Sequence, residues 1–150
     1  MNQAFGGAFL IKIALIFLSI YIVVLGFAMN YAKVFTMKNK IITLIEQYEG
    51  YSDTDSSGTD IVDEIAARAN ELQYKGITDG SAAAYINDKG WDCVNTRNLN
   101  LYCIVETTAD NYTYYKVITF IQFNIPIVTS IAKGIIPITG ETRYIYNFDN

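Results

Sequence analysis

Hydrophobic residues fill one long segment near the start of the chain, from Ala8 to Met29, and Lys12 is its only charged residue. The apolar part after Lys12 reaches about 20 residues when it is extended to Ala32, which is the length that a helix needs to cross the hydrocarbon core of a bilayer. Lys12 lies near one end, where its long side chain can reach the headgroup region. The pattern predicts a single-pass transmembrane helix over residues 8–32.

A cleaved signal peptide is the alternative interpretation of this segment. The leader MNQAF carries no Lys or Arg, the apolar run is longer than an ordinary signal-peptide core, and no small-residue cleavage signal follows promptly. We therefore expect the helix to be retained as an anchor.

The helical period continues beyond the apolar segment. Spacings of three and four residues place these apolar side chains on one stripe: Val34, Met37, Ile41, Leu44 and Tyr48. Lys38, Asn39 and Lys40 fall largely elsewhere. We expect residues 33–50 to form an amphipathic stalk helix that continues the span, with Gly50 as its left-handed C-terminal cap.

The next hundred residues change from helical to strand periodicity. A polar loop over 51–59 precedes a second helix, which we expect to start at Asp60 and to close at Lys75 and Gly76, with Ile61, Ile65, Ala69 and Leu72 as its apolar positions. Residues 77–90 are weakly patterned, and we expect a loop with a helical turn near 81–86.

From Leu99 onward, alternation with a period of two predicts strands before and after a turn at 107–111, and therefore an antiparallel hairpin. A short helix from Pro126 to Gly134 and a last aromatic strand over 142–148 complete the prediction. The fold class is thus α+β, with residues 51–150 as one α+β domain. A sheet of three or four strands would bury one face under the stalk helix.

Composition limits the functions that this domain can have. The chain has 150 residues, so about 100 remain outside one span, enough for a single modest core. Residues 51–150 hold seven Lys and Arg against thirteen Asp and Glu, a net charge of −6, which argues against a nucleic-acid partner. Histidine is absent from the sequence, so the commonest general base and metal ligand is missing, and we do not expect an enzyme.

One pair of residues has the spacing of a catalytic motif. Ser130 and Lys133 have the S-x-x-K spacing of penicillin-recognising enzymes, but the companion motifs of those enzymes do not accompany them. We expect an amphipathic turn there and no catalytic residue.

Cys93 and Cys103 are the only cysteines, and nine residues separate them. In an oxidising compartment they could close a disulfide across a short loop; the alternative is two buried thiols. Lys33, Lys38 and Lys40 follow the span and, by the positive-inside rule, would favour a cytoplasmic domain, whereas a disulfide favours the outside. Because the lysines also fit the solvated face of a stalk, we expect an extracytoplasmic domain.

The polar loop has the spacing of a calcium-binding loop. Asp53, Asp55, Ser57, Gly58 and Glu64 fit D-x-D-x-S-G-x5-E, in which side-chain oxygens alternate and the last Glu binds through both oxygens. The eighth position, usually aliphatic, is Asp60 here. The alternative is a plain acidic linker that leads into a helix N-terminus, and apart from calcium no cofactor is expected.

The chain is also rich in aromatic residues, with twelve Tyr and eight Phe. The aromatic residues of the strands could serve sheet packing, or they could form a binding surface, for example for another copy of the chain.

Three segments carry a resemblance to a known family. They are residues 30–50 (NYAKVFTMKNKIITLIEQYEG), residues 123–128 (FNIPIV) and residues 140–146 (GETRYIY). With the anchor, they resemble type IV pilin-like proteins, and more narrowly the TadE-type minor-pilin-like proteins of Gram-positive tight-adherence (Tad) pilus systems. The resemblance implies a long N-terminal helix, embedded in the membrane in its first half and packed on an antiparallel sheet in its second.

Gly6 and Gly7 before AFLIK also resemble a prepilin-peptidase site, with cleavage after Gly7. Pilins carry a Glu at the fifth position of the mature chain, where this sequence has Lys12. In pilins that Glu is thought to neutralise the amino terminus of a neighbouring subunit. A lysine at the same position would repel that amino terminus. An unprocessed or accessory subunit therefore fits better than a major pilin.

Together these features predict a structural protein of the cell membrane, a minor pilin or pseudopilin of a surface pilus or secretion apparatus that could be assembled into a surface filament. Its partners would be the membrane and other pilin-like subunits or pilus assembly proteins. A membrane-tethered calcium- or ligand-binding domain is the alternative.

Overall fold

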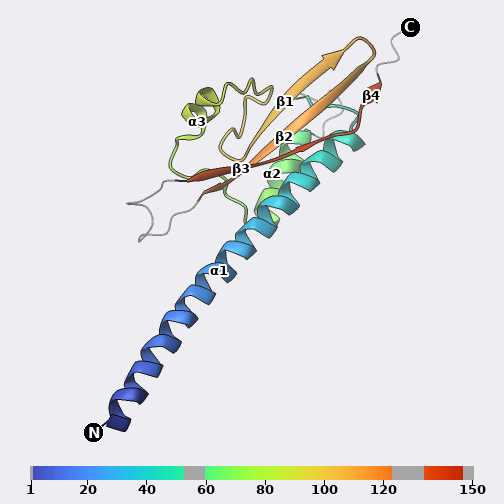
Figure 1. Ribbon diagram of the computed structural model, residues 1–150. Coiled ribbons are helices and arrows are strands. Elements are labelled where there is room, and N and C mark those ends of the chain that lie inside the picture. Colours follow the sequence, from blue (N-terminus) through green and yellow to red (C-terminus); the bar gives the residue numbers. More distant parts are fainter. Residues whose placement is uncertain (1, 53–59, 123–133, 147–150) are drawn as a thin grey trace. The chain divides into compact units, whose positions relative to one another are not determined.

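The computed structural model describes residues 2–52, 60–122 and 134–146 (Figure 1). Its helices are α1 (Asn2–Gln47), α2 (Ile61–Glu71) and α3 (Ala82–Asp88), and its strands are β1 (Tyr102–Ala109), β2 (Tyr112–Gln122), β3 (Ile135–Glu141) and β4 (Ile145–Tyr146). The chain divides into two compact units, Met1–Ala32 and Lys33–Asn150, with the division inside α1. The second unit is called the head below. The protein is therefore α+β, and each unit is described by itself.

The first unit is helical. From Phe9 to Tyr31 its large apolar side chains are exposed except for the half-buried Ile13, with exposed fractions between 43% for Phe27 and 69% for Phe17. Ser19 satisfies its own hydroxyl within the helix by donating to the carbonyl oxygen of Leu15 at 2.8 Å. The helix from Gly6 to Gln47 contains a window of mean hydropathy 2.7 and is long and apolar enough to cross a membrane.

The head contains a four-stranded antiparallel sheet with β2 at its centre. On one edge β2 pairs with β1, from Tyr102 opposite Thr119 to Ala109 opposite Tyr112. On its other edge β2 pairs first with β3 and then, nearer the hairpin, with β4. The hairpin turn between β1 and β2 has only two residues, Asp110 and Asn111, so both strands are longer than the sequence predicted.

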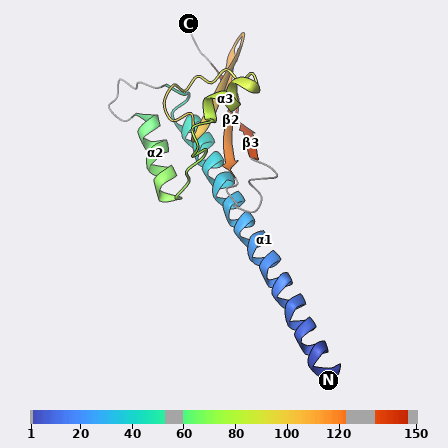
Figure 2. The ribbon, with the colours of Figure 1, turned by 90° about the vertical axis from the view of Figure 1, so that its left-hand side faces the viewer.

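One face of the sheet packs against α2 and residues 33–47 of α1, which lie beside each other (Figure 2). Four of the five predicted stripe residues are buried there, at 7% exposure or less: Val34, Met37, Ile41 and Leu44. Tyr48, the fifth, is 37% exposed, so the prediction was wrong for that residue. Lys38, which we expected to be solvated, is only 8% exposed because its stem lies along β3 near Gly140.

Gly140 allows this close approach of α1 to the sheet. A Cβ atom at Gly140 would lie 2.8 Å from Cδ1 of Ile42 and 3.0 Å from Cδ of Lys38. The side chains of Ile42 and Lys38 therefore lie directly against the backbone of Gly140, and a side chain at this position would require them to shift.

The opposite face of the sheet is also covered, which the sequence did not predict. Cys103, Ile118 and Phe120 pack there against Ile77 and α3, with Trp91 and Leu99 at the margin. The predicted helical turn near 81–86 is the seven-residue helix α3. Alternating strand residues thus enter two different cores, one on each side of the sheet.

Helices α1 and α2 are each followed by a residue other than glycine in the left-handed backbone conformation. After α1, Glu49 has φ +54° and the Gly50 amide donates to the carbonyl oxygen of Ile45 at 3.0 Å. After α2, Gln73 has φ +52° and the Tyr74 amide donates to the carbonyl oxygen of Ala69 at 2.8 Å. These six-to-one bonds are Schellman caps. The predicted positions were therefore wrong: the cap of α1 lies one residue before Gly50, and α2 ends at Glu71, before Lys75 and Gly76.

The C-terminal region also differs from the prediction. Residues 135–141 form β3, a strand that the sequence analysis missed, and of the aromatic strand predicted over 142–148 the described residues 142–146 form only β4. Between them Thr142 continues the pairing, since its amide donates to the Tyr115 carbonyl oxygen at 2.9 Å and its hydroxyl accepts the Tyr115 amide at 3.0 Å. The predicted helix from Pro126 and the FNIPIV segment lie outside the described residues.

Candidate functional site

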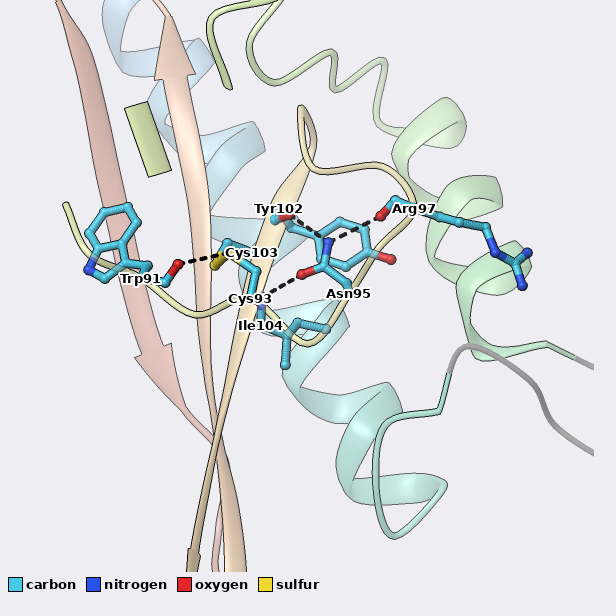
Figure 3. Close-up of a disulfide and its surroundings, with 7 residues drawn as sticks. All are labelled: Trp91, Cys93, Asn95, Arg97, Tyr102, Cys103 and Ile104. Carbon is cyan, nitrogen blue, oxygen red and sulfur yellow. Dashed lines mark hydrogen bonds between the residues drawn. A yellow bond between two sulfur atoms is a disulfide. The ribbon is translucent and has the colours of Figure 1, made fainter. Parts of the chain in front are cut away.

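A disulfide joins Cys93, in the loop before β1, to Cys103 in β1, with 5.3 Å between the two Cα atoms (Figure 3). Cys103 is fully buried in the second core, while Cys93 is partly buried. The bond fastens the loop that carries Trp91 to the outer edge of the sheet. Free thiols at Cys93 and Cys103, the alternative to a disulfide, are therefore absent from this structure.

Asn95 continues the attachment of this loop to β1, and Figure 3 shows its amide between Tyr102 and Ile104. The side chain is 1% exposed. Its Nδ2 donates to the carbonyl oxygens of Tyr102 at 3.0 Å and Arg97 at 3.1 Å, and its Oδ1 accepts the Ile104 amide at 2.9 Å. Asn95 thus satisfies edge groups of β1 as a neighbouring strand would. The sequence analysis missed it, because the loop has no periodic pattern of apolar and polar residues.

The calcium-loop prediction involves two described carboxylates, and both have other partners. Glu64 Oε2 accepts the Tyr48 hydroxyl at 3.0 Å, while Glu64 Oε1 lies 3.5 Å from Arg68. Asp60 caps α2 through its Oδ1, which accepts the Val62 amide at 3.0 Å, and its Oδ2 lies 3.1 Å from Arg97 Nη2. The position that departed from the calcium pattern therefore serves as a helix N-cap.

The remaining calcium-loop residues, Asp53, Asp55 and Ser57, lie outside the described residues, as do Ser130 and Lys133. In residues 2–52, 60–122 and 134–146, there is no group of three or more Asp, Glu, Cys or His side chains that could hold a metal ion.

A groove of about 540 Å³ runs between α1 and α2 in the head. Two of its charged residues share a partner on α2, since Lys40 Nζ lies 3.4 Å and Arg68 Nη1 3.2 Å from the same oxygen of Glu71. Hydrogen bonds from Arg68 and then Lys40 lower the pKa of Glu71. These exposed pairs tie the helices together only weakly.

Four tyrosines gather where the hairpin end of β2 meets β4, and we call Tyr112, Tyr114, Tyr144 and Tyr146 the tyrosine cluster. The ring centroid of Tyr144 lies 4.7 Å from that of Tyr112 and 5.7 Å from that of Tyr114, and the centroid of Tyr146 lies 6.4 Å from that of Tyr112. Tyr144 and Tyr146 are 60% and 59% exposed. Other strand aromatics, such as Phe120 and Tyr102, are buried in the cores, so the aromatic residues serve two different environments.

A pocket of about 380 Å³ adjoins the tyrosine cluster. It is lined by Glu46 and Glu49 from the end of α1 and by the segment from Arg143 to Tyr146. Glu46 Oε1 accepts the backbone amide of Arg143 at 2.8 Å, which fixes this carboxylate against the segment. The pocket therefore has both carboxylate and aromatic walls.

The features that could serve an interaction are thus the exposed apolar helix of the first unit and, in the head, the tyrosine cluster with its pocket. A comparison of the chain with protein-family models, curated proteins and solved structures found no match in any of the three.

Proposed function

We propose that this protein is a structural, non-enzymatic subunit of the pilin-like type, held in a cell membrane by residues 8–32 and displaying its head on the extracytoplasmic side. The observation that carries the proposal is the contrast within α1. Nearly all large apolar side chains from Phe9 to Phe27 are exposed, whereas Val34, Met37, Ile41 and Ile45 are buried in the head core. Exposed apolar surface of that length needs lipid or other helices around it.

The disulfide supports the extracytoplasmic side. Bonds between cysteines form and persist in oxidising compartments and are rare in the cytosol. The bond between buried Cys103 and Cys93 therefore supports an oxidising environment for the head. This weighs against the cytoplasmic orientation that Lys33, Lys38 and Lys40 favoured.

The pilin-like part of the proposal is supported by the order of the elements and by the resemblance of residues 30–50 and 140–146. A long N-terminal helix precedes an antiparallel sheet, and residues 33–47 of that helix pack on the sheet. Small residues in the span, Ala14, Gly26 and Ala28, would let other helices approach closely in the bilayer. Lys12 favours an accessory role over a place in a filament shaft.

The proposal is tested by cysteine labelling on intact cells. In a variant with Cys93→Ala and Cys103→Ala, the exposed Asp88 is replaced by cysteine, and a membrane-impermeant maleimide is added before or after lysis. We expect the protein in the membrane fraction after alkaline extraction, with Asp88→Cys labelled on intact cells. Release by alkali would contradict the anchor, and labelling only after lysis would contradict the orientation. The intact mass of the membrane protein reports whether residues 1–7 have been removed.

A further inference from the structure

We propose that the head binds an Arg- or Lys-bearing segment of a partner protein where the tyrosine cluster meets the pocket between Glu46, Glu49 and Tyr144. This goes beyond the proposed function because it names the chemistry of a partner. It does not depend on how the apolar helix associates.

The arrangement of the rings is the first observation. Tyr144 lies at 60° to the ring of Tyr112 and at 87° to the ring of Tyr114, so the rings turn their faces in different directions. Tyr144 is 60% exposed, so its ring is accessible from solvent. A guanidinium or ammonium group within about 6 Å of such a face is attracted by the quadrupole of the ring.

The head already uses this interaction elsewhere. Lys38 Nζ lies 4.4 Å from the centroid of Phe35, and Lys89 Nζ lies 5.6 Å from the centroid of Tyr85. In those two places the cation comes from the chain itself. At the tyrosine cluster, a cation from the partner would lie over a tyrosine ring in the same way.

The carboxylates of the pocket are the second observation. Glu46 and Glu49 line it together with one basic residue, Arg143, so acidic side chains outnumber basic ones along the wall. Glu46 is positioned by its bond to the Arg143 amide. A pocket of about 380 Å³ has room for a long basic side chain, with its stem against Tyr144 and Ile145 and its charge near the carboxylates.

Charge decides between the possible occupants. The head, residues 33–150, carries ten Lys and Arg against fifteen Asp and Glu, a net charge of −5, which attracts a cationic partner over distances of a Debye length and repels a second copy of the same head. A neutral partner could donate hydrogen bonds to Glu46 and Glu49 but would lack the charge attraction to them. A basic segment of another protein fits both the field of the head and the local walls.

The experiment measures binding of a fluorescent poly-arginine peptide to the full chain in neutral detergent by anisotropy, with a poly-glutamine peptide as the uncharged comparison. We expect saturable binding of the arginine peptide that weakens with added salt. Tyr144→Leu should weaken binding at least about fivefold, whereas Tyr144→Phe, which keeps the ring, should retain it. Glu49→Gln should weaken binding, and Asp88→Asn, an exposed acid on α3, should not.

Three results would overturn the proposal. They are no saturable binding by the unmodified chain, equal losses in Glu49→Gln and Asp88→Asn, and unchanged binding in Tyr144→Leu. A dimer of the unmodified chain that Tyr144→Leu dissociates would instead assign the surface to a second copy. Since the readout concerns the head alone, failure here leaves the labelling test of the membrane anchor unaffected.

Discussion

The hydroxyl of Tyr74 accepts a hydrogen bond from the backbone amide of Phe120 at 2.9 Å, although the two residues are 46 positions apart in the sequence. The same hydroxyl donates to the carbonyl oxygen of Leu101 at 2.7 Å, with the Phe120 carbonyl oxygen also in reach at 3.1 Å. The β1–β2 ladder stops at Tyr102 opposite Thr119. Tyr74 therefore extends the pairing by one position, and it connects the segment after α2 to the residue before β1 and to the central strand β2.

Tyr74→Phe should destabilise the head, because the buried Phe120 amide and Leu101 carbonyl would lose their partner. We expect the free energy of unfolding to fall by about 2 kcal/mol, measured by chemical denaturation of the full chain in detergent. Tyr85→Phe is the matched control, since its hydroxyl makes one longer bond, 3.3 Å to the Ile135 carbonyl oxygen. Equal losses in the two variants would contradict the role of Tyr74.

Tyr74 should also make stability depend on pH. Burial is the main cause that raises the pKa of Tyr74 above its ordinary value of 10.0. Above that value the unfolded chain loses the Tyr74 proton while the folded chain keeps it, so this contribution to stability is complete below pH 10 and is lost as the pH rises. The unmodified chain should lose up to about 1.4 kcal/mol per pH unit more than Tyr74→Phe. Parallel curves for the two proteins above pH 10 would refute this.

Gly76 and Gly90 form a natural pair for a backbone test, because both have left-handed φ values, +61° and +66°. A Cβ at Gly76 would lie 2.9 Å from the Cα of Leu101, whereas a Cβ at Gly90 would meet open space. Gly90→Ala should therefore cost only the backbone strain, about 1 kcal/mol. Gly76→Ala should add a backbone clash and cost more than about 4 kcal/mol or prevent folding. Similar unfolding midpoints for the two variants would show that the approach of Gly76 to β1 is not tight.

Asn95→Ala should be costly because the amide makes three hydrogen bonds at 1% exposure. Removing it leaves the Ile104 amide and the Tyr102 carbonyl unsatisfied at a buried strand edge, which should cost about 3 kcal/mol. The exposed Asn87 gives the control, and Asn87→Ala should change the midpoint of thermal unfolding little. Hydrogen exchange at Ile104 should accelerate in Asn95→Ala; protection equal to that of the unmodified chain would contradict the assignment.

The sequence predicted the parts of the fold that periodicity governs. A period of 3.6 placed Val34, Met37, Ile41 and Leu44 against the sheet, and a period of two predicted the hairpin. Periodicity did not predict the burial of Lys38, because a lysine stem can be buried while its ammonium group reaches outward.

What the sequence could not predict depends on contacts between distant segments. Tyr74 satisfies backbone groups of Leu101 and Phe120, and Asn95 satisfies backbone groups of β1. The identity of a polar residue does not show which backbone groups it will contact. Residues 77–99 cover the second face without any period of their own. The tyrosine cluster likewise forms from β2, β4 and the residue before β4, so the excess of tyrosine was visible in the sequence while its division between core and surface was not.

Reduction of the disulfide should weaken the head without abolishing it. Cys93 and Cys103 are ten positions apart in the sequence, so the bond closes a short loop, and loops of this size contribute about 2–3 kcal/mol. We expect denaturation of the full chain to shift to lower denaturant when a reductant is present, with alkylation and mass measurement to verify that the bond is open. Cys93→Ala/Cys103→Ala should unfold near the reduced protein and should not respond to reductant. A verified reduction that leaves the midpoint unchanged would show that Asn95 and the packing of Trp91 hold the loop on β1 without the bond.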